Sequence, residues 1–150
     1  WLPERMIMSD PRKWMKSCLD KWSGNHKFGN VEEAYLKSFK QKKRIHASCE
    51  DYRASATIDL EHDRKDRNKK LNIPLQVLWG KSGVIGKQFN AIKIWQKYSN
   101  KKVNGKAIES GHHIPEQNPK QIIYQLKKFF LKYFFFHGQR RAIQLVVYDI

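Results

Sequence analysis

The sequence predicts an α/β protein, and three observations lead to this prediction. Up to about residue 70, apolar side chains recur at helical spacing. At Ile73-Pro74 the pattern changes to short apolar runs, of which the first, Leu75–Trp79, is closed by Gly80. These runs alternate with helical periodicity, as in a right-handed unit of parallel strands joined by a helix. The chain has 150 residues, 40% of them hydrophobic, which is enough for one modest domain with a packed core.

The first helix is predicted to begin at Asp10-Pro11. Aspartate is a favoured N-cap residue, and proline is favoured at the first helical position because its missing N–H would be unsatisfied there anyway. Gly24 then ends the apolar periodicity. The apolar residues of this helix would be Trp14, Met15, Cys18, Leu19 and Trp22.

Two further helices are expected before the change of pattern. Asn30 is expected to cap the first of them, with Glu32 and Glu33 near its positive end. Ser48 is expected to cap the second, which should run from roughly residue 49 to residue 61. One face of that second helix would carry Tyr52, Ala56 and Leu60.

The second half of the chain is predicted to hold two parallel strands and two helices. The strand candidates are residues 75–79 and 103–108, with a helix over 91–98 between them. Pro119 begins a long closing helix that should cover the sheet, an interpretation favoured over a helix lying on a membrane surface. From Gly138 to Ile150 the sequence differs again and becomes β-prone near its end. The apolar side of the closing helix would contain Ile122, Ile123, Leu126, Phe129 and Phe130.

The net charge of +16 raises the question of an acidic partner, such as nucleic acid or an anionic membrane. Lysines occur in nearly every segment, and only residues 64–70 form a dense basic block. That block lacks the interleaved aromatic residues on which nucleic-acid bases stack. A solvated, lysine-rich surface is therefore the favoured interpretation, and neither nucleic acid nor a membrane is an expected partner.

Cysteine and histidine usage gives little support for a metal site. Cys18 and Cys49 are far apart and fit no metal spacing, and the adjacent His112 and His113 lack flanking ligands. We therefore expect no metal, no cofactor and no disulfide, which makes a reducing cytoplasm the default compartment. No apolar run approaches the roughly 20 residues that a membrane span needs. The chain opens on Trp1 rather than methionine, which indicates an incomplete or processed chain.

The stretch from Glu109 to Pro119 is the most informative part of the sequence. A strand candidate ends there, Gly111 follows, and His112 comes next, before a helix start at Asn118-Pro119. This layout places one imidazole on a loop at the carboxyl end of a strand, where α/β folds keep their chemistry. Histidine is also the usual proton shuttle near neutral pH. His112 is therefore a candidate catalytic residue, although a single Gly-His pair also fits many structural histidines.

A wider set of motifs resembles the haloacetate (fluoroacetate) dehalogenases, which are α/β-hydrolase-fold enzymes related to the epoxide hydrolases. The resemblance covers residues 2 to about 130. It is strongest over 49–54 and 59–63, and the combination of Glu-Asp-Tyr-Arg-Ala with a later Gly-His is specific. The other matching residues are Leu2-Pro3-Glu4, Asp10-Pro11, Pro74-Leu75, Leu78-Trp79-Gly80, Trp95, Gly105, Glu109-Ser110-Gly111-His112 and Pro115-Glu116.

The resemblance implies that the chain is the C-terminal part of an α/β-hydrolase fold. Residues 1–45 would be a segment of the helical cap, and residues 46–135 would supply the last two parallel strands and the closing helix of the core. Residues 136–150 have no counterpart in the family and would form a divergent tail. The implied reaction cleaves a carbon–halogen bond in two steps. An aspartate displaces the halide to form an ester, and a histidine activates the water that cleaves this ester.

Two residues of the chain match functional positions of this family. His112 matches the water-activating histidine, and Tyr52 matches the tyrosine whose hydroxyl helps to hold the departing halide. Such a donor is needed because fluoride leaves poorly unless its developing charge is stabilised. His113 takes the place of an aromatic neighbour and is expected to be structural. Without the family match, Tyr52 would be interpreted as an ordinary core residue of an amphipathic helix.

Other functional groups of the family have no counterpart in the sequence. The region from Gly80 to Gly86 holds Ser82 but is not expected to form a nucleophile elbow, because it lacks the strand-to-helix layout. The substrate-binding arginines, the triad acid and the halide-binding His-Trp pair would lie upstream, since Trp1 is too close to Leu2-Pro3-Glu4 to be that tryptophan. We therefore expect a chain that is inactive alone. Its complete enzyme would act on a small anionic substrate such as a haloacetate, with a homodimer as the oligomer that the family suggests.

Three other interpretations remain open at this point. An epoxide hydrolase or an ester-cleaving α/β hydrolase shares the Gly-His ending. A basic module that binds nucleic acid would use the block at residues 64–70, and its binding would weaken with added salt. A remnant that does not fold alone would leave the edges of half a sheet uncovered and would aggregate.

Overall fold

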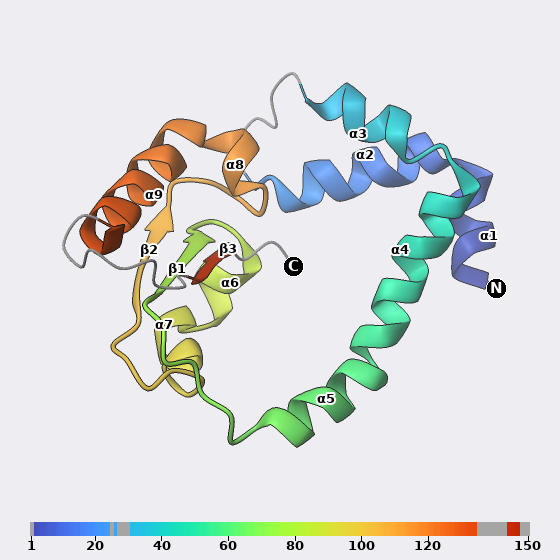
Figure 1. The fold of residues 1–150 in the computed structure, drawn as a ribbon. Coiled ribbons are helices and arrows are strands. Elements are labelled where there is room, and N and C mark those ends of the chain that lie inside the picture. The colour runs from blue at the N-terminus through green and yellow to red at the C-terminus, as the bar shows by residue number, and fades with distance from the viewer. Residues whose placement is uncertain (1, 25, 27–30, 135–143, 148–150) are drawn as a thin grey trace. The chain divides into compact units, whose positions relative to one another are not determined.

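A computed structural model of the chain describes residues 2–24, 26, 31–134 and 144–147. Within these residues the chain divides into two compact units (Figure 1). The helical unit comprises Trp1–Lys21 and Phe28–Asn68, and the sheet unit comprises Trp22–Lys27 and Lys69–Ile150. The division into cap and core at residue 45, and the tail from residue 136, stay predictions.

Two buried apolar clusters hold pairs of helices together in the helical unit. In one cluster, Ile7 packs with Ile45 and Cys49. In the other, Leu19 packs with Leu36. The helices of this part of the chain are α1 (Leu2–Ser9), α2 (Pro11–Trp22), α3 (Glu32–Ser38), α4 (Lys42–Ser55) and α5 (Ile58–Asp66).

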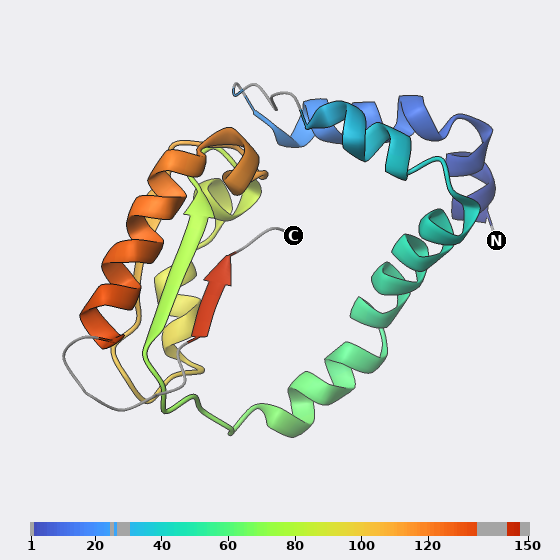
Figure 2. The same cartoon turned by 45° about the horizontal axis from the view of Figure 1, so that its top comes forward.

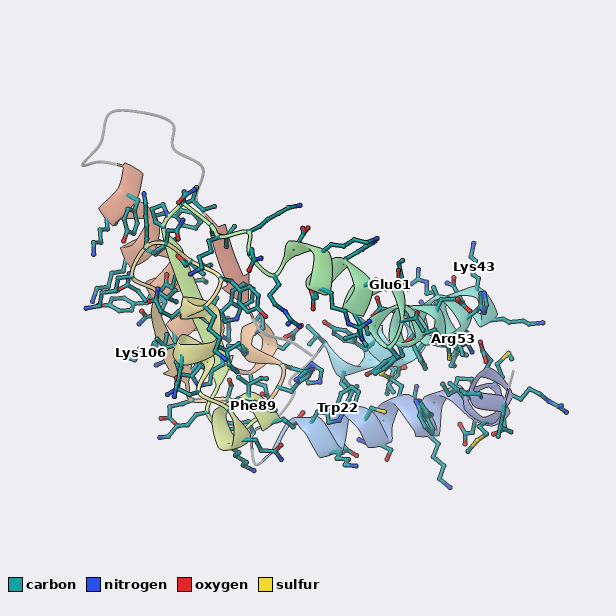
Figure 3. All side chains as sticks on the ribbon, turned by 90° about the horizontal axis from the view of Figure 1, so that it is seen from below. Trp22, Lys43, Arg53, Glu61, Phe89 and Lys106 are labelled. Carbon is teal, nitrogen blue, oxygen red and sulfur yellow. The ribbon has the colours of Figure 1, made fainter. Side chains whose placement is uncertain are left out.

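Helix α2 begins and ends where the sequence predicts. The backbone N–H of Lys13 donates a 2.9 Å hydrogen bond to Oδ1 of Asp10, which confirms the N-cap. Trp22 lies at the end of the helix (Figure 3). Gly24 follows with φ +61°, a left-handed conformation that glycine adopts without steric cost. The predicted cap of α3, Asn30, lies outside the described residues.

The prediction of one helix over residues 49–61 is wrong in two respects. The observed helix begins earlier, and it is interrupted before residue 61. Helix α4 already begins at Lys42, so Ser48 lies inside the helix and does not cap it. The earlier start extends an apolar face on which Ile45 and Cys49, four residues apart, are both buried.

A break at Thr57 then separates α4 from α5. Its backbone is not helical (φ −134°, ψ −92°), and its hydroxyl donates a 2.7 Å hydrogen bond to the carbonyl oxygen of Arg53. A local side-chain bond of this kind satisfies a carbonyl that the continuing helix would otherwise have used. The segment that the resemblance matches most strongly is therefore two short helices and not one.

Among the described residues, the sheet unit contains three parallel strands in the order β2-β1-β3. They are β1 (Leu75–Gly80), β2 (Asn104–Ile108) and β3 (Gln144–Val147). In the central strand, Val77 pairs with Gly105 on one side and Val146 on the other. The two predicted strands and the α/β fold class are confirmed. The third strand comes from the β-prone end of the chain, which the sequence pattern does not assign to the sheet.

Helices cover both faces of the central strand (Figure 2). Leu75 and Val77 pack against Ala91 of α7 (Ala91–Gln96), together with the partly buried Ile85 of α6 (Val84–Gln88). On the opposite face, Leu78 packs with Ile114 of α8 (Ile114–Gln117) and with Ile122 of α9 (Pro119–Phe134). A strand buried on both faces is typical of a parallel sheet in an α/β fold.

Helix α9 begins at Pro119 as predicted, but one of its expected core residues is exposed. Ile122 and Phe129 are buried, whereas Ile123 is 50% exposed. The reason is geometric, because neighbouring residues on a helix point about 100° apart, and Ile122 takes the inward position. Helix α7 also ends at Gln96, two residues earlier than predicted. In the part of the chain that the structure describes, no helix is long and apolar enough to cross a membrane.

Candidate active site

The loops that follow β1 and β2 meet at two glycines. A Cβ atom added to Gly80 would lie 1.7 Å from the carbonyl oxygen of Gly111, so a side chain cannot fit there. The backbone N–H of Ser82 donates a 3.0 Å hydrogen bond to the carbonyl oxygen of Ser110. These contacts fix the loop that carries His112 at the carboxyl edge of the sheet, where the sequence predicts it.

Trp22 at the end of α2 and Ser23 after it pack directly against the same loop. The backbone N–H of His112 donates a 2.9 Å hydrogen bond to the carbonyl oxygen of Trp22. A Cβ atom added to Gly111 would lie 2.3 Å from the carbonyl oxygen of Ser23, so this approach also requires glycine. The backbone of His112 is therefore held by residues from a distant part of the sequence.

Gln117 joins these two segments through its side-chain amide. Its Oε1 accepts a 2.7 Å hydrogen bond from the backbone N–H of Gly111. Its Nε2 donates to the carbonyl oxygens of Ser23 at 3.1 Å and His26 at 3.3 Å. Sequence reasoning missed Gln117, and no local pattern could have indicated its role, because two of its partners lie 94 and 91 residues away in the chain.

The imidazole of His112 is half-buried beside two other rings. Its centroid lies 5.4 Å from that of Trp22 and 4.9 Å from that of His113. Burial lowers the pKa of His112 below its usual value, and the charge of Glu116 opposes this effect in part. The ring is therefore neutral near pH 7 and can accept a proton, as a general base must.

His113 is buried, and its structural role stays a prediction. Burial lowers its pKa, the proximity of His112 lowers it further, and Glu116 acts in the opposite direction. Two adjacent imidazoles that both resist protonation keep positive charge out of this part of the loop near neutral pH. That condition suits a base that must receive a proton from water.

The surroundings of Ser82 differ from the expectation in one respect. Strand β1 does lead through a turn into helix α6, so the strand-to-helix layout expected to be missing is present. The Gly-x-Ser-x-Gly pattern is nevertheless incomplete, because Val84 stands where its second glycine would be. The hydroxyl of Ser82 lies 3.5 Å from Nε2 of His26, at the limit of hydrogen bonding.

Tyr52 lies on α4 in the helical unit and His112 lies in the sheet unit. The tyrosine side chain is 65% exposed, so it is not a core residue of its own unit. Leu60, expected on the same buried face, is exposed as well. Exposure leaves the phenol of Tyr52 available to contact another group, which an ordinary core position would not.

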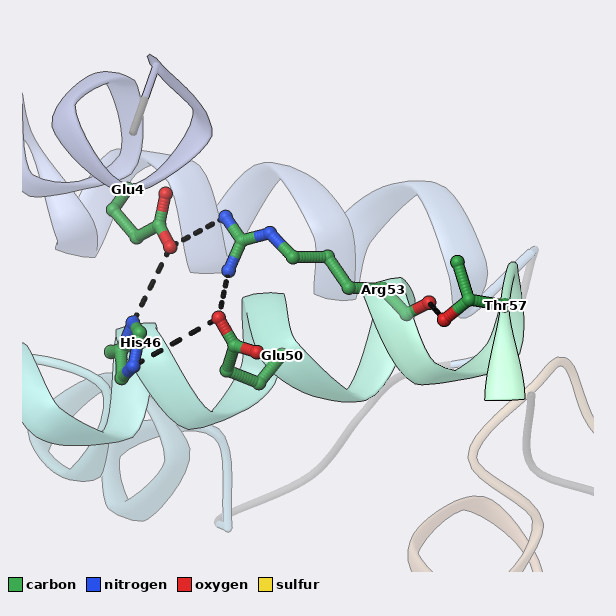
Figure 4. Close-up of polar contacts among 5 residues, drawn as sticks. All are labelled: Glu4, His46, Glu50, Arg53 and Thr57. Carbon is green, nitrogen blue, oxygen red and sulfur yellow. Dashed lines mark hydrogen bonds and ion pairs between the residues drawn. The ribbon is translucent and has the colours of Figure 1, made fainter. Parts of the chain in front are cut away.

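A buried carboxylate anchors the helix that carries Tyr52 (Figure 4). Glu4 of α1 is 5% exposed and lies 2.6 Å from Nη2 of Arg53. Burial alone would raise the pKa of Glu4, but the hydrogen bond from Arg53, a backbone hydrogen bond, the charge of Arg53 and the contact with His46 together lower it. This ion pair connects the Leu2-Pro3-Glu4 motif with the Glu-Asp-Tyr-Arg-Ala motif. Its arginine, Arg53, directly follows Tyr52 in the sequence.

The same cluster has the ligand types of a metal site. Glu4, His46 and Glu50 place one ligand atom each within 4.8 Å of one another. The guanidinium of Arg53, however, already pairs with both carboxylates. A metal ion there would have to displace this cation, so we interpret the cluster as an ion-pair network.

Comparisons with known proteins agree with the fold. No family model matches the chain. The sequence is 29% identical over 131 residues to a fluoroacetate dehalogenase from Burkholderia sp, covering 85% of this chain and 42% of that protein.

Solved structures extend this similarity. A candidate acyltransferase from Salmonella enterica is 34% identical with a TM-score of 0.82, over 87% of this chain and 44% of its own. A candidate α/β hydrolase from Nostoc sp PCC 7120 is 37% identical with a TM-score of 0.81, over 86% and 45%. A candidate epoxide hydrolase from Pseudomonas aeruginosa is 31% identical with a TM-score of 0.76, over 87% and 45%.

The parallel sheet and these similarities show that the chain has part of an α/β-hydrolase fold. The chain spans less than half the length of the relatives that it matches. The resemblance to the fluoroacetate dehalogenases is confirmed, and the partial coverage fits a C-terminal part of such a protein.

Proposed function

We propose that this chain contributes the water-activating base of a haloacetate dehalogenase-like hydrolase. In the first step, an aspartate oxygen forms a bond to the carbon that bears the halogen, and the halide leaves with the bonding electrons. In the second step, Nε2 or Nδ1 of His112 accepts a proton from water while the water oxygen attacks the carbonyl of the aspartyl ester. The bond between the aspartyl carbonyl carbon and the ester oxygen then breaks, and His112 returns the proton to that oxygen. The hydroxy acid leaves, and the aspartate is regenerated.

The observation that supports this role most strongly is the setting of His112. Its backbone N–H is held by Trp22, its ring lies beside the rings of Trp22 and His113, and burial lowers its pKa, so the ring is neutral near pH 7 before substrate arrives. A preoriented base lowers the entropic cost of the second step. Tyr52 is proposed as a donor to the departing halide, and its exposure leaves the phenol hydroxyl free for that contact.

The nucleophilic aspartate, the triad acid and the groups that bind the substrate carboxylate are proposed to come from polypeptide beyond these 150 residues. The relatives are more than twice as long as the matched region, which leaves room for these groups. The chain by itself is therefore proposed to be inactive. A small carboxylate such as a haloacetate is the proposed substrate of the complete protein.

Fluoride release from fluoroacetate by the purified chain tests whether the nucleophile lies outside these 150 residues. We expect no release above the buffer rate from the chain or from its His112→Ala variant. Sustained release that His112→Ala abolishes would show that the nucleophile lies inside the chain. A His113→Ala variant serves as the control, because it alters the neighbouring ring and leaves the proposed base in place.

An epoxide hydrolase is the second candidate, and the Pseudomonas aeruginosa structure favours it at 31% identity. An ester intermediate cleaved by an activated water would use His112 in the same way. The two candidates differ in the first step, because opening an epoxide needs a donor to the ring oxygen and releases no halide. The test needs a polypeptide that also holds the nucleophile. If that polypeptide forms a diol from an epoxide but releases no fluoride from fluoroacetate, the epoxide hydrolase is favoured.

The cytoplasm is the proposed compartment. Cys18 and Cys49 are both free thiols in the structure. Burial raises the pKa of each thiol above its usual value, which keeps both protonated and slow to oxidise near neutral pH. Thiols without disulfide partners are typical of proteins from reducing compartments.

A further inference from the structure

The outward side of helix α9 combines positive charge with exposed apolar side chains. Ile122, Gln125 and Phe129 on its opposite side are buried, and Ile122 packs with Leu78 and Ile108 of the sheet. The helix contains no aspartate or glutamate. We call the exposed set the outer face of α9, and it consists of Lys120, Ile123, Tyr124, Lys127, Lys128, Leu131 and Lys132.

The apolar members of the outer face are large and open to solvent. Ile123 is 50% exposed, Tyr124 is 61% exposed and Leu131 is 52% exposed. Single exposed apolar residues are common on protein surfaces, but here three of them share one side of a helix with four lysines. The sequence pattern had assigned Ile123 to the core, so its exposure was not anticipated.

We propose that the outer face of α9 docks onto an anionic lipid surface. The helix would lie in the plane of the membrane, with Ile123, Tyr124 and Leu131 at the boundary between headgroups and acyl chains. The lysine ammonium groups would reach the lipid phosphates and carboxylates, because their flexible stems can lie along apolar surface while the charge stays in water. The sequence alone favours no membrane partner. The exposure of Ile123, Tyr124 and Leu131 is the observation that leads to this proposal.

Charge and chemistry distinguish this partner from two others. A second copy of the chain also carries +16, so the approach of two outer faces would be opposed by repulsion. A nucleic acid would match the lysines but would leave Ile123 and Leu131 without apolar contact. An anionic bilayer complements the ammonium groups and the apolar side chains together.

Cosedimentation of the full 150-residue chain with vesicles tests the proposal. We expect binding to phosphatidylcholine vesicles that contain phosphatidylserine, little binding to pure phosphatidylcholine, and weaker binding at high salt. Absence of binding to the phosphatidylserine vesicles at low salt would overturn the proposal.

Two matched double variants locate the binding face. Lys127→Gln with Lys128→Gln should weaken vesicle binding by a factor on the order of 25, since each lysine near an anionic surface contributes about fivefold. Lys42→Gln with Lys43→Gln removes the same charge from the exposed first turn of α4, where Lys43 points away from the ribbon (Figure 3). This control pair should change binding by less than about threefold. Equal losses in the two pairs would mean attraction by net charge alone and would overturn the proposal.

An apolar variant separates a membrane from a nucleic acid. Ile123→Ser with Leu131→Ser should weaken vesicle binding by about tenfold or more, because two apolar side chains no longer enter the interface. Both residues are exposed, so an unchanged far-UV circular dichroism spectrum is expected. Unchanged vesicle binding in this variant would overturn the proposal. Tight, salt-sensitive binding of duplex DNA that depends on Lys127 and Lys128, without vesicle binding, would assign the face to nucleic acid instead.

Discussion

The backbone N–H of His112 donates a 2.9 Å hydrogen bond to the carbonyl oxygen of Trp22, and the two side-chain rings lie 5.4 Å apart. One residue from the end of α2 thus fixes both the backbone and the surroundings of the candidate base. Burial of the ring lowers the pKa of His112. The position and the protonation state of this imidazole therefore depend on a contact between distant parts of the sequence.

Replacing Gln117 should loosen this contact. Gln117→Ala removes the acceptor for Gly111 N–H and the donor to Ser23 and His26, and it leaves these part-buried groups without those bonds. We expect a loss of about 1–3 kcal/mol in the free energy of unfolding, measured by urea denaturation. Gln117→Glu keeps the acceptor but places a carboxylate oxygen against the carbonyl oxygens of Ser23 and His26, so it should also destabilise the chain. Equal stability of Gln117→Ala and the unsubstituted chain would contradict this role.

Gly111 should not tolerate a side chain. In Gly111→Ala, the new Cβ would lie 2.3 Å from the carbonyl oxygen of Ser23, so the backbone must move. Overpacking of this kind costs about 1–3 kcal/mol, which should appear as a lower urea midpoint. Gly83→Ala is the matched control, because its Cβ would meet its nearest neighbour at 3.4 Å, an ordinary contact distance. The expectation is wrong if the two variants unfold at the same urea concentration.

Glu116 should control the titration of both neighbouring histidines. Its negative charge raises the pKa of His112 and of His113, against the stronger effect of burial. Glu116→Gln should therefore lower both pKa values, as measured by NMR titration of the imidazole signals. Glu109→Gln is the control, because this carboxylate pairs with Lys81 and is not among the charges that shift the pKa of His112 or His113. Upward shifts in Glu116→Gln would contradict the electrostatic assignment.

The same two histidines predict the pH dependence of stability. Because both folded-state pKa values lie below the unfolded value of about 6.5, the unfolded chain binds more protons below that pH. Their contribution to stability is present above pH 6.5 and is lost as the pH falls from there through the folded pKa values. Thermal melts between pH 7.5 and 5, roughly the window set by these groups, should show this decline. A His112→Phe, His113→Phe double variant should show a smaller decline over the same range.

The ion pair between Glu4 and Arg53 should stabilise the helical unit. Glu4→Gln keeps the size of the side chain but removes the charge that pairs with the guanidinium, so the melting temperature should fall. Glu50→Gln removes an exposed carboxylate from the same arginine and should have a smaller effect. Because the pKa of Glu4 is lowered, its contribution should also be lost as the pH falls below about 4.5 through the folded pKa. A larger fall in melting temperature for Glu50→Gln would contradict this order.

Local signals predicted those elements whose ends are determined by neighbouring residues. Asp10 and Pro11 start α2 and Gly24 terminates it through interactions that reach only a few positions along the chain. Pro119 starts α9 for the same reason. The start of α4 was missed because its early turn is stabilised by burial of Ile45 against α1, which no local signal reveals.

The sequence predicts which residue of the candidate site could act as a base, but not the residues that hold it in place. The Gly-His sequence after a strand indicated a base at the sheet edge, and the structure places His112 there. The groups that hold it could not be found in the same way, because Trp22 and Gln117 act through contacts across most of the chain. The exposure of Tyr52 likewise depends on the packing of α4, which its own sequence does not determine.

Fluoride release by a fusion protein tests the role of His112 most directly. The fusion would join this chain to the N-terminal part of the Burkholderia fluoroacetate dehalogenase that the chain does not match. With His112 present, we predict sustained fluoride release from fluoroacetate. With His112→Ala, we predict one fluoride for each protein molecule and a persistent glycolyl ester, detected by mass spectrometry, because the ester forms but is not hydrolysed. Sustained turnover by the His112→Ala fusion at the rate of the unsubstituted fusion would contradict the proposal that His112 activates the water.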